Sequence, residues 1–335
     1  MTAVDQLGRS LGDLRLSVTD RCNMRCTYCM PREIFGRDYQ FLSRQQMLSY
    51  EEITRVVKAF VQLGTRKVRI TGGEPLLRRQ LPQLVKMLSV IPGLEDLTLT
   101  TNGALLQQYA QALADAGLQR LTVSLDAVDT EVFAAMTDSD IAVSQVMEGI
   151  QAAEAAGLGP IKINVVVKKN VNDHLVVDLA RQFHGTGHII RFIEYMDVGA
   201  TNGWQLVDVV PVAILVDRIN AVMPLEPLEP NYQGEVARRW RYVDGGGEVG
   251  FIASVSQPFC TDCTRARVSA DGKVYTCLFS SQGHDLRHLL RSGSSPHDLT
   301  QVIDSIWHSR KDRYSELRAA QAPSLSKVEM SYIGG

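Results

Sequence analysis

Apolar and polar residues alternate in two different periods between residues 13 and 196. Residues 14–19 alternate strictly, which is the pattern of a half-buried strand. Further along, Ser49 and Glu52 form the capping-box pattern that begins a helix, and Gly64 is placed to end this helix in the left-handed conformation. The apolar residues of this helix share one face: Ile53, Val56, Val57 and Phe60. The sequence therefore predicts a strand and then an amphipathic helix.

The same strand-helix cycle recurs further along the chain. Helical patterns end near Gly117 and Gly157. Five further strands are predicted, at residues 68–71, 97–101, 121–125, 161–167 and 189–193. Repeated strand-helix units predict a parallel sheet that is either doubly wound or curved into a barrel.

Polar residues on the predicted strands distinguish between these two kinds of sheet. Strands of a doubly wound sheet are buried on both faces and read as almost continuous apolar runs. Five successive strands instead carry polar residues between apolar neighbours: Arg15 and Ser17, Arg69 and Thr71, Thr98 and Thr100, Thr122 and Ser124, and Lys162 and Asn164. Chance polar residues near strand ends are the alternative. A shared polar face favours a barrel with a ligand in its lumen and functional groups at the C-terminal strand ends.

Six predicted strands are fewer than the eight of a complete barrel, so we expect an α/β fold with a partial (β/α)6 barrel of the TIM type. The pattern changes after Val207, and residues 223–230 are rich in proline and predict an extended connection. Glycine-rich turns, a hairpin and short amphipathic helices follow. We therefore expect a barrel core at residues 1–205 and a C-terminal α+β extension at residues 206–335 that closes the open side.

Composition and charge limit the kinds of partner that this protein is expected to bind. Of 335 residues, 45% are hydrophobic and 21% are charged, which is ordinary for a globular protein. The net charge of -2 predicts no general attraction to nucleic acid or to acidic membranes. No apolar run approaches membrane-spanning length, and the first residues lack a signal-peptide pattern, so we expect a cytoplasmic protein.

Cysteines are the strongest chemical signal in the sequence. Disulfides are rare in the reducing cytoplasm, and clustered cysteines favour metal binding over buried, inert thiols. The six cysteines fall into two groups of three: Cys22, Cys26 and Cys29, and Cys260, Cys263 and Cys277.

The first cysteine group forms a CxxxCxxC loop directly after the first predicted strand. Cysteine thiolates hold a four-iron cluster, and three of them leave one iron open to another ligand. A structural zinc ion normally takes four ligands, and no histidine nearby supplies the fourth. This spacing, with the aromatic Tyr28 before the last cysteine, resembles the radical S-adenosylmethionine (SAM) superfamily. In that superfamily the open iron chelates the amino and carboxylate groups of SAM.

Gly72, Gly73 and Glu74 follow the second predicted strand, where a backbone without side chains lets a ligand approach closely. Alone, this tripeptide is a common turn. At the end of the second strand, after a CxxxCxxC loop on the first, it is similar to the superfamily's site for the amino group of SAM. The resemblance also implies SAM contacts from three further residues: Tyr28, Ser124 and Met196.

The second cysteine group is brought together by a predicted hairpin. Asp271 and Gly272 form a two-residue turn signal between two strands. This register places Cys277 opposite Ala266 and therefore near Cys263. The three late cysteines can then converge on one metal centre.

Two arginines accompany this predicted centre. Arg265 and Arg267 lie two residues apart on one strand of the hairpin and would project together from one face. A zinc site completed by His284 is an alternative on spacing alone.

The whole set of motifs is similar to the GTP 3′,8-cyclase family, whose members end in two glycines, as Gly334 and Gly335 do here. The resemblance implies a partial barrel of six β-α units with a second [4Fe–4S] cluster, which binds the guanine of GTP. It implies GTP contacts from Arg15, Arg69, Thr100, Lys162, Arg265, Ala266 and Arg267. It implies catalytic roles for Arg15, Arg265, Arg267, Gly334 and Gly335.

The implied reaction is the first step of molybdenum cofactor biosynthesis. GTP, SAM and a reductant give 3′,8-cyclo-7,8-dihydro-GTP, 5′-deoxyadenosine and methionine. The implied partners are an electron donor and the next enzyme, cyclic pyranopterin monophosphate synthase, with no nucleic acid and no membrane. The protein itself would be a monomer or a homodimer.

Two other functions compete with this interpretation. A radical SAM peptide maturase also carries auxiliary clusters, but it usually has more than three late cysteines and no reason to collect arginines. A non-catalytic iron- or zinc-binding regulator would leave the placement of Gly72, Gly73 and Glu74 unexplained.

Overall fold

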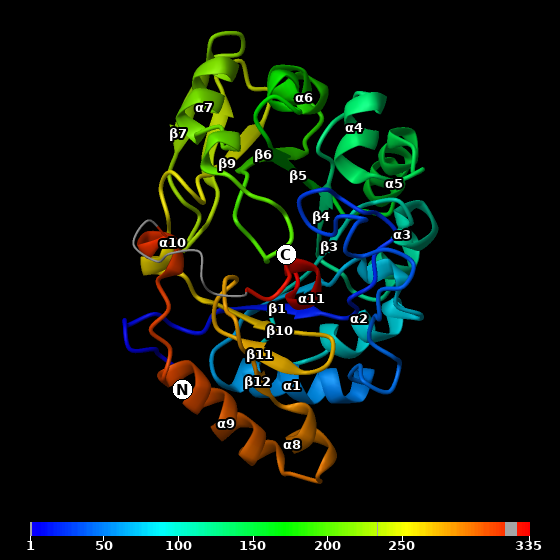
Figure 1. The fold of residues 1–335 in the computed structure, drawn as a ribbon, viewed down its shortest axis with the longest axis vertical. Coiled ribbons are helices and arrows are strands. Elements are labelled where there is room, and N and C mark those ends of the chain that lie inside the picture. The colour runs from blue at the N-terminus through cyan, green and yellow to red at the C-terminus, as the bar shows by residue number, and fades with distance from the viewer. Residues whose placement is uncertain (1, 233, 319–326) are drawn as a thin grey trace.

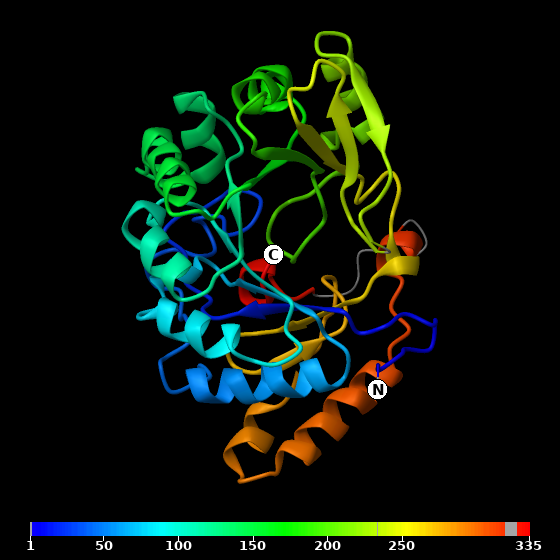
Figure 2. The same ribbon diagram turned by 180° about the vertical axis from the view of Figure 1, so that it is seen from behind.

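Six parallel strands form the centre of the computed structural model, which describes residues 2–232, 234–318 and 327–335 (Figure 1). They pair in sequence order, as predicted: β1 (Asp13–Ser17), β2 (Lys67–Thr71), β3 (Asp96–Thr101), β4 (Arg120–Ser124), β5 (Lys162–Val167) and β6 (Ile189–Glu194). Helices cover the outer face of this curved sheet (Figures 1 and 2): α1 (Tyr50–Gln62), α2 (Leu81–Ser89), α3 (Leu106–Asp115), α4 (Thr130–Thr137), α5 (Val143–Ala155) and α6 (Val176–Phe183).

The first helix begins and ends as its sequence predicts. The Ser49 hydroxyl accepts the backbone N–H of Glu52 at 3.1 Å, and the Glu52 carboxylate accepts the backbone N–H of Ser49 at 2.7 Å. Gly64 adopts a φ of +107° just beyond the helix, where a residue with a side chain would be strained. The predicted apolar face is buried against the sheet.

The C-terminal region extends both edges of the sheet. Its strands are β7 (Leu225–Leu228), β8 (Arg238–Tyr242), β9 (Glu248–Ile252), β10 (Arg265–Val268), β11 (Lys273–Tyr275) and β12 (His284–Asp285). Strand β9 adds to β6 and β10 adds to β1, both in parallel, and antiparallel strands follow on each side. The outermost strands, β7 and β12, do not pair with each other in the described residues. The fold is therefore a partial barrel with an α+β extension, and its sheet remains open.

The remaining helices lie mainly in the C-terminal region. They are α7 (Val212–Asn220), α8 (Arg287–Arg291), α9 (Pro296–His308), α10 (Tyr314–Leu317) and α11 (Met330–Ile333), with short 3₁₀ helices at Pro75–Leu77, Asp173–Leu175, Leu206–Asp208 and Cys260–Asp262. The proline-rich segment is more ordered than predicted, because it forms β7 at one edge of the sheet, where Pro227 is tolerated. No helix among the described residues is long and apolar enough to cross a membrane.

The hairpin of β10 and β11 has a longer turn than the sequence analysis predicted. Arg267 pairs with Tyr275, so the turn contains three residues rather than two. Gly272 takes the left-handed conformation with a φ of +87°, which is typical of the last residue in a three-residue hairpin loop. The Ser269 hydroxyl accepts the backbone N–H of Lys273 at 3.0 Å across this turn.

This extra turn residue changes the predicted register by one position. Continuing the observed pairing places Cys277 opposite Arg265, not opposite Ala266. The side chain of Ala266 is buried in the hydrophobic core, on the face opposite its two arginine neighbours. Ala266 can therefore meet a ligand in the lumen only through its backbone.

Candidate active site

The polar residues predicted on the strands line one face of the sheet. Strand register aligns them in three rows: Arg267, Arg15, Arg69 and Thr98; Thr100, Thr122 and Lys162; and Ser124, Asn164 and Arg191. Aligned residues share a face, and alternate residues such as Leu14, Leu16 and Val68 are buried on the other face. The predicted polar lumen is confirmed.

Arg191 is a lumen residue that the sequence analysis missed. It lies between Ile190 and Phe192 on β6, and this is the same alternation that revealed the other polar positions. Its Nη2 donates to Thr122 Oγ1 at 3.4 Å. Arg69 donates to the same oxygen at 2.8 Å, so one threonine orients two guanidinium groups.

The lumen contains buried positive charge that protein groups only partly neutralise. Burial and the nearby Arg69 lower the pKa of Arg15 to about 9, and burial and Arg15 lower the pKa of Arg267 to about 9. Burial and Arg191 lower the pKa of Arg69 to about 10 and that of Lys162 to about 7. Mutual repulsion of this kind is relieved by a bound anion.

Buried polar atoms in the lumen also lack partners. Unsatisfied buried polar groups are rare in folded proteins and call for an explanation. Four atoms of the lumen face have no hydrogen-bond partner among the described residues: Arg15 Nε, Arg69 Nε, Asn164 Oδ1 and Arg191 Nε. The lumen is therefore suited to a polar, anionic ligand.

The first cysteine loop follows β1 and is held in place by its neighbours. Arg25 donates to the carbonyl oxygens of Cys22 and Met24, each at 2.8 Å. Asn102, at the end of β3, donates to Asn23 Oδ1 at 2.8 Å and lies 3.8 Å from the Cys22 sulfur. Asn102 was not predicted as a site residue.

Tyr28 connects this loop to the ends of two strands. Its hydroxyl donates to Asp126 Oδ2 at 2.7 Å, and Asp126 Oδ1 accepts the backbone N–H of Val166 at 2.8 Å. Burial raises the pKa of Asp126 to about 6. Asp126 is a further residue that the sequence analysis missed, because an acidic residue after a strand gives no sign of its distant partner.

Gly72 and Gly73 lie close against the backbone that leads into the cysteine loop. A side chain at Gly72 would collide with the carbonyl oxygen of Thr19, and one at Gly73 with that of Arg21. Gly72 also has a φ of +152°, which residues with side chains rarely adopt. The two glycines therefore allow the end of β2 to pack against this loop.

Glu74 is occupied by donors from the protein. Its buried carboxylate accepts Thr101 Oγ1–H and the backbone N–H of Asn102, each at 2.7 Å, and the backbone N–H of Leu76 at 2.9 Å. Burial raises its pKa to about 7. In this structure, Glu74 ties the end of β2 to the end of β3.

Ser124 and Met196 lie at the same edge of the barrel as the cysteine loop. Ser124 is the last residue of β4, and Met196 follows β6 by two residues. The carbonyl oxygen of Met196 accepts Asn202 Nδ2–H at 3.1 Å. The predicted SAM contacts, Glu74 included, thus lie near the C-terminal strand ends, where barrel enzymes place their functional groups.

The second cysteine group is surrounded by guanidinium groups. Arg310 donates to the Cys263 sulfur at 3.2 Å and to its carbonyl oxygen at 2.6 Å, and Arg265 lies 3.9 Å from the same sulfur. Burial alone would raise the pKa of Cys263, but Arg265 and Arg310 outweigh it and lower this pKa to about 6. At Cys263 the thiolate, which is the form that binds metals, is therefore favoured.

A buried ion-pair network of Asp5, Arg9 and Arg310 contacts the second cysteine group. Asp5 accepts Arg9 Nε–H at 2.6 Å and lies 3.4 Å from Arg310, and all three side chains are almost completely buried. Arg9 also donates to the carbonyl oxygen of Cys260 at 2.8 Å. Such long-range contacts give no local signal, so the sequence analysis did not find Asp5, Arg9 or Arg310.

The zinc alternative requires four ligands around one ion. No three His, Cys, Asp or Glu side chains in the described part of the chain are gathered closely enough to hold a single metal ion. His284, the fourth ligand of the zinc alternative, is exposed on β12 opposite Val274.

The C-terminal glycines reach the lumen arginines. Figures 1 and 2 place α11 and the C-terminus inside the curve of the sheet. The carbonyl oxygen of Gly334 accepts Arg267 Nη1–H, and that of Gly335 accepts Arg15 Nη1–H at 3.1 Å. Gly334 has a φ of +80°, and a side chain there would collide with Thr71. The described tail is therefore packed in the lumen rather than frayed.

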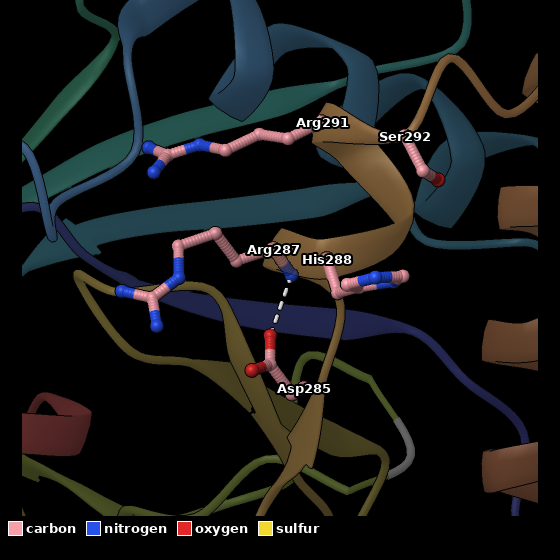
Figure 3. Close-up of a pocket in the computed structure, with 5 residues that line it drawn as sticks. All are labelled: Asp285, Arg287, His288, Arg291 and Ser292. Atoms are coloured by element: carbon pink, nitrogen blue, oxygen red, sulfur yellow. Dashed lines mark hydrogen bonds between the residues drawn. The ribbon is translucent and has the colours of Figure 1, made fainter.

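A separate hollow of about 400 Å³ lies at α8, away from the lumen. Figure 3 shows its lining residues: Asp285, Arg287, His288, Arg291 and Ser292. Arg291 donates to the carboxylate of Glu52 at 2.8 Å and to backbone carbonyls that precede α1. These contacts fasten α8 to α1, and the hollow contains none of the predicted site residues.

Comparison with known proteins first shows the superfamily to which the chain belongs. Residues 16–183 match the family model for the Radical SAM superfamily, and residues 188–316 match Molybdenum Cofactor Synthesis C. The crystal structure of Streptococcus suis SuiB bound to S-adenosylmethionine shares the fold, with a TM-score of 0.64 over 98% of this chain and 78% of that chain at 13% identity. The protein is a member of the radical SAM superfamily.

More similar relatives define the family within this class. The GTP 3′,8-cyclase of Acidothermus cellulolyticus is 53% identical over 99% of this chain and 98% of its own length. The GTP 3′,8-cyclases of Xanthomonas campestris pv. campestris strain B100 and Staphylococcus haemolyticus are 53% and 47% identical, over 99% of this chain and 97% and 98% of theirs. The chain belongs to the GTP 3′,8-cyclase family.

Proposed function

We propose that this protein is a GTP 3′,8-cyclase that forms 3′,8-cyclo-7,8-dihydro-GTP from GTP in the first step of molybdenum cofactor biosynthesis. SAM is consumed as a co-substrate, and a reductant supplies electrons. The single observation that carries the proposal is the set of cations gathered in the lumen, in which Arg69 and Arg267 are buried and Arg15 is partly buried. A triphosphate needs several cations, and the forked donors of arginine suit phosphate oxygens.

Cys22, Cys26 and Cys29 would hold a [4Fe–4S] cluster. When bound, this cluster supplies the electron that divides SAM into methionine and a 5′-deoxyadenosyl radical. The chain's own residues would orient SAM beside it: Gly72 and Gly73 let the end of β2 pack against the cysteine loop, and Tyr28, Ser124 and Met196 lie at the same edge of the barrel. Glu74 supports this site by holding Thr101 and Asn102.

The substrate would lie between the arginines and the C-terminal tail. Arg15, Arg265 and Arg267 would bind and orient GTP, with Arg69, Thr100 and Lys162 further along the lumen and the backbone of Ala266 beside them. Gly334 and Gly335 would complete the site, because glycine carbonyls reach Arg267 and Arg15 without a side chain in the cavity.

Cys260, Cys263 and Cys277 would hold a second [4Fe–4S] cluster that binds the guanine of GTP. We expect the wild-type chain to contain about eight irons, as two four-iron clusters require. Cys277→Ser should lose the second cluster and cyclisation but retain the first cluster and SAM cleavage. Metal analysis with four irons and one zinc per wild-type chain would instead support the zinc alternative.

We further propose that residues 1–205 form the barrel core and residues 206–335 the region that carries the second cluster. A cytoplasmic, reducing location suits six cysteines that are all free in the structure. The partners would be an electron donor and cyclic pyranopterin monophosphate synthase, which consumes the product.

GTP affinity tests the substrate assignment. Arg267→Ala should weaken GTP binding about ten- to a hundredfold, because a hydrogen bond to a charged group contributes about 1.5–3 kcal/mol. Calorimetry with the cluster-loaded protein measures this. The matched control is Arg241→Ala, because Arg241 forms an exposed ion pair with Glu226 and such pairs contribute little. Equal GTP affinity in both variants would place the β10 arginines outside the substrate site.

A further inference from the structure

The loop after β6 and the C-terminal segment are joined by two acidic residues. Lys327 Nζ donates to Asp197 Oδ2 at 2.6 Å and to the Asp197 carbonyl oxygen at 2.8 Å. In the opposite direction, the Glu329 carboxylate accepts the backbone N–H of Ala200 at 2.9 Å and the hydroxyl of Thr201 at 3.1 Å. These contacts connect positions more than 120 residues apart in sequence.

Asp197 is a fixed anchor for this junction. It is buried, and in addition to Lys327 it accepts the Tyr314 hydroxyl at 2.7 Å and Arg318 Nε–H at 2.9 Å. A buried carboxylate with this many donors stays in one arrangement, because each lost contact would leave a desolvated charge. Asp197 directly follows Met196, so the anchor holds the chain beside the proposed SAM contact.

Gly199 shows that the loop is built around the Glu329 carboxylate. It has a φ of +67°, and a side chain at this position would overlap the carboxylate oxygen of Glu329. Glycine is therefore favoured here by the backbone conformation, and its lack of a side chain leaves room for the Glu329 carboxylate. The loop therefore accommodates the Glu329 carboxylate where glycine takes the left-handed conformation without strain.

The segment of residues 327–335, which contains Glu329, leads directly to the lumen arginines. Val328 donates its N–H to the carbonyl oxygen of Ser280 at 3.1 Å, close to the second cysteine group. Ile333 is completely buried, and the next two residues reach Arg267 and Arg15. The segment is thus fastened at both ends, with only a few residues between the β6 loop and the proposed GTP site.

We propose that Glu329 is a positioning residue that fixes the C-terminal tail to the loop after β6 and thereby couples SAM binding to GTP binding. The inference rests on the proposed function, because it takes SAM and GTP as the ligands at the two ends. When SAM binds, the loop after β6 would close around it and hold the C-terminal tail in the lumen. GTP bound against the tail would in turn hold the loop in the same position. Such coupling is reciprocal, so each ligand raises the affinity of the other by the same factor.

Proteolysis measures the fastening of the tail without any ligand or turnover. Trypsin cleaves after lysine, and cleavage after Lys327 releases residues 328–335, which mass spectrometry detects. Glu329→Ala should raise this cleavage rate roughly ten- to a hundredfold, the range for losing a hydrogen bond to a charged group when the open population governs cleavage. Glu329→Gln, which keeps an acceptor oxygen, should fall between the wild type and Glu329→Ala.

Two further variants separate this contact from a general loss of stability. Thr201→Val removes one donor from the other side of the contact, and Gly199→Ala displaces the carboxylate, so both should increase the same cleavage. Glu148→Ala removes an equal charge from an exposed position on α5 and should change nothing. Equal cleavage in the wild type, Glu329→Ala and Gly199→Ala overturns the inference.

Binding of SAM with and without GTP measures the coupling itself. In the cluster-loaded wild type, GTP should tighten SAM binding about five- to 150-fold, the usual range for coupled sites, and the factor should fall towards one in Glu329→Ala. A wild-type factor of one, or an unchanged factor in the variant, overturns the coupling. If the wild type makes the cyclised product but its coupling factor is one, or the factor is unchanged in Glu329→Ala, only this inference fails. If it neither binds nor converts GTP, the proposed function fails.

Discussion

Cys26→Ser should abolish the cleavage of SAM by this protein. The first cysteine loop offers three thiolates to a four-iron cluster, so no fourth cysteine in the loop can replace a lost ligand. Cys26 is half-buried and packs against the hydrophobic core, so its side chain is held at the loop. The yield of 5′-deoxyadenosine under anaerobic conditions measures this result.

The matched control is Cys277→Ser, which removes a cysteine from the second group. That variant should still produce 5′-deoxyadenosine, because the proposed SAM cluster remains intact. A near-normal yield from Cys26→Ser, with iron content unchanged, is the outcome that contradicts our assignment of the first loop.

Deletion of Gly334 and Gly335 should separate SAM cleavage from product formation. The tail carbonyls occupy Arg267 and Arg15, and their loss leaves both guanidinium groups without these acceptors. We expect the cyclised product to fall about a hundredfold, because misplacement of reacting atoms by about 1 Å has an effect of this size. Cluster content and 5′-deoxyadenosine formation should remain largely unchanged. Chromatography of both products in one reaction measures the ratio.

Two controls make this deletion informative. Addition of two glycines beyond Gly335 tests chain length, and circular dichroism tests whether Ile333 still anchors the tail in the core. Full product yield from the deleted protein would show that these glycines do not contribute to the reaction.

Much of the fold follows from local patterns in the sequence. The capping box at Ser49 and Glu52 and the glycine at position 64 define α1, because each acts on its own helix end. The polar face of the strands was predictable for a similar reason, since a strand's alternation reports burial directly. The same alternation of apolar and polar residues marks Arg191 on β6.

Features that depend on distant partners could not be predicted. The hairpin register depended on whether Asp271 joined Gly272 in the left-handed conformation, as a two-residue turn requires. Only Gly272 does so, and the resulting shift of one residue moved Cys277 away from Ala266. Arg310 reaches Cys263 across 47 residues, and Tyr28 reaches Asp126 across 98. No local pattern encodes such pairs.

The cysteine pattern supplied more of the site than the surrounding residues did. Its spacing identified the loop that follows β1, and its resemblance to a known family supplied the SAM and GTP assignments. What the structure adds is the network that supports these groups: Asn102 beside Cys22, Arg310 beside Cys263, and Glu329 beside the loop after β6.

Anaerobic turnover tests the central claim most directly. The protein is reconstituted with iron and sulfide, then supplied with SAM, GTP and a chemical reductant, and the products are identified by mass spectrometry. We predict that 5′-deoxyadenosine and a cyclised guanine nucleotide, 3′,8-cyclo-7,8-dihydro-GTP, appear together in equal amounts and that omission of GTP removes the second. Cleavage of SAM in a protein with two full clusters, with GTP recovered unchanged, would contradict the account.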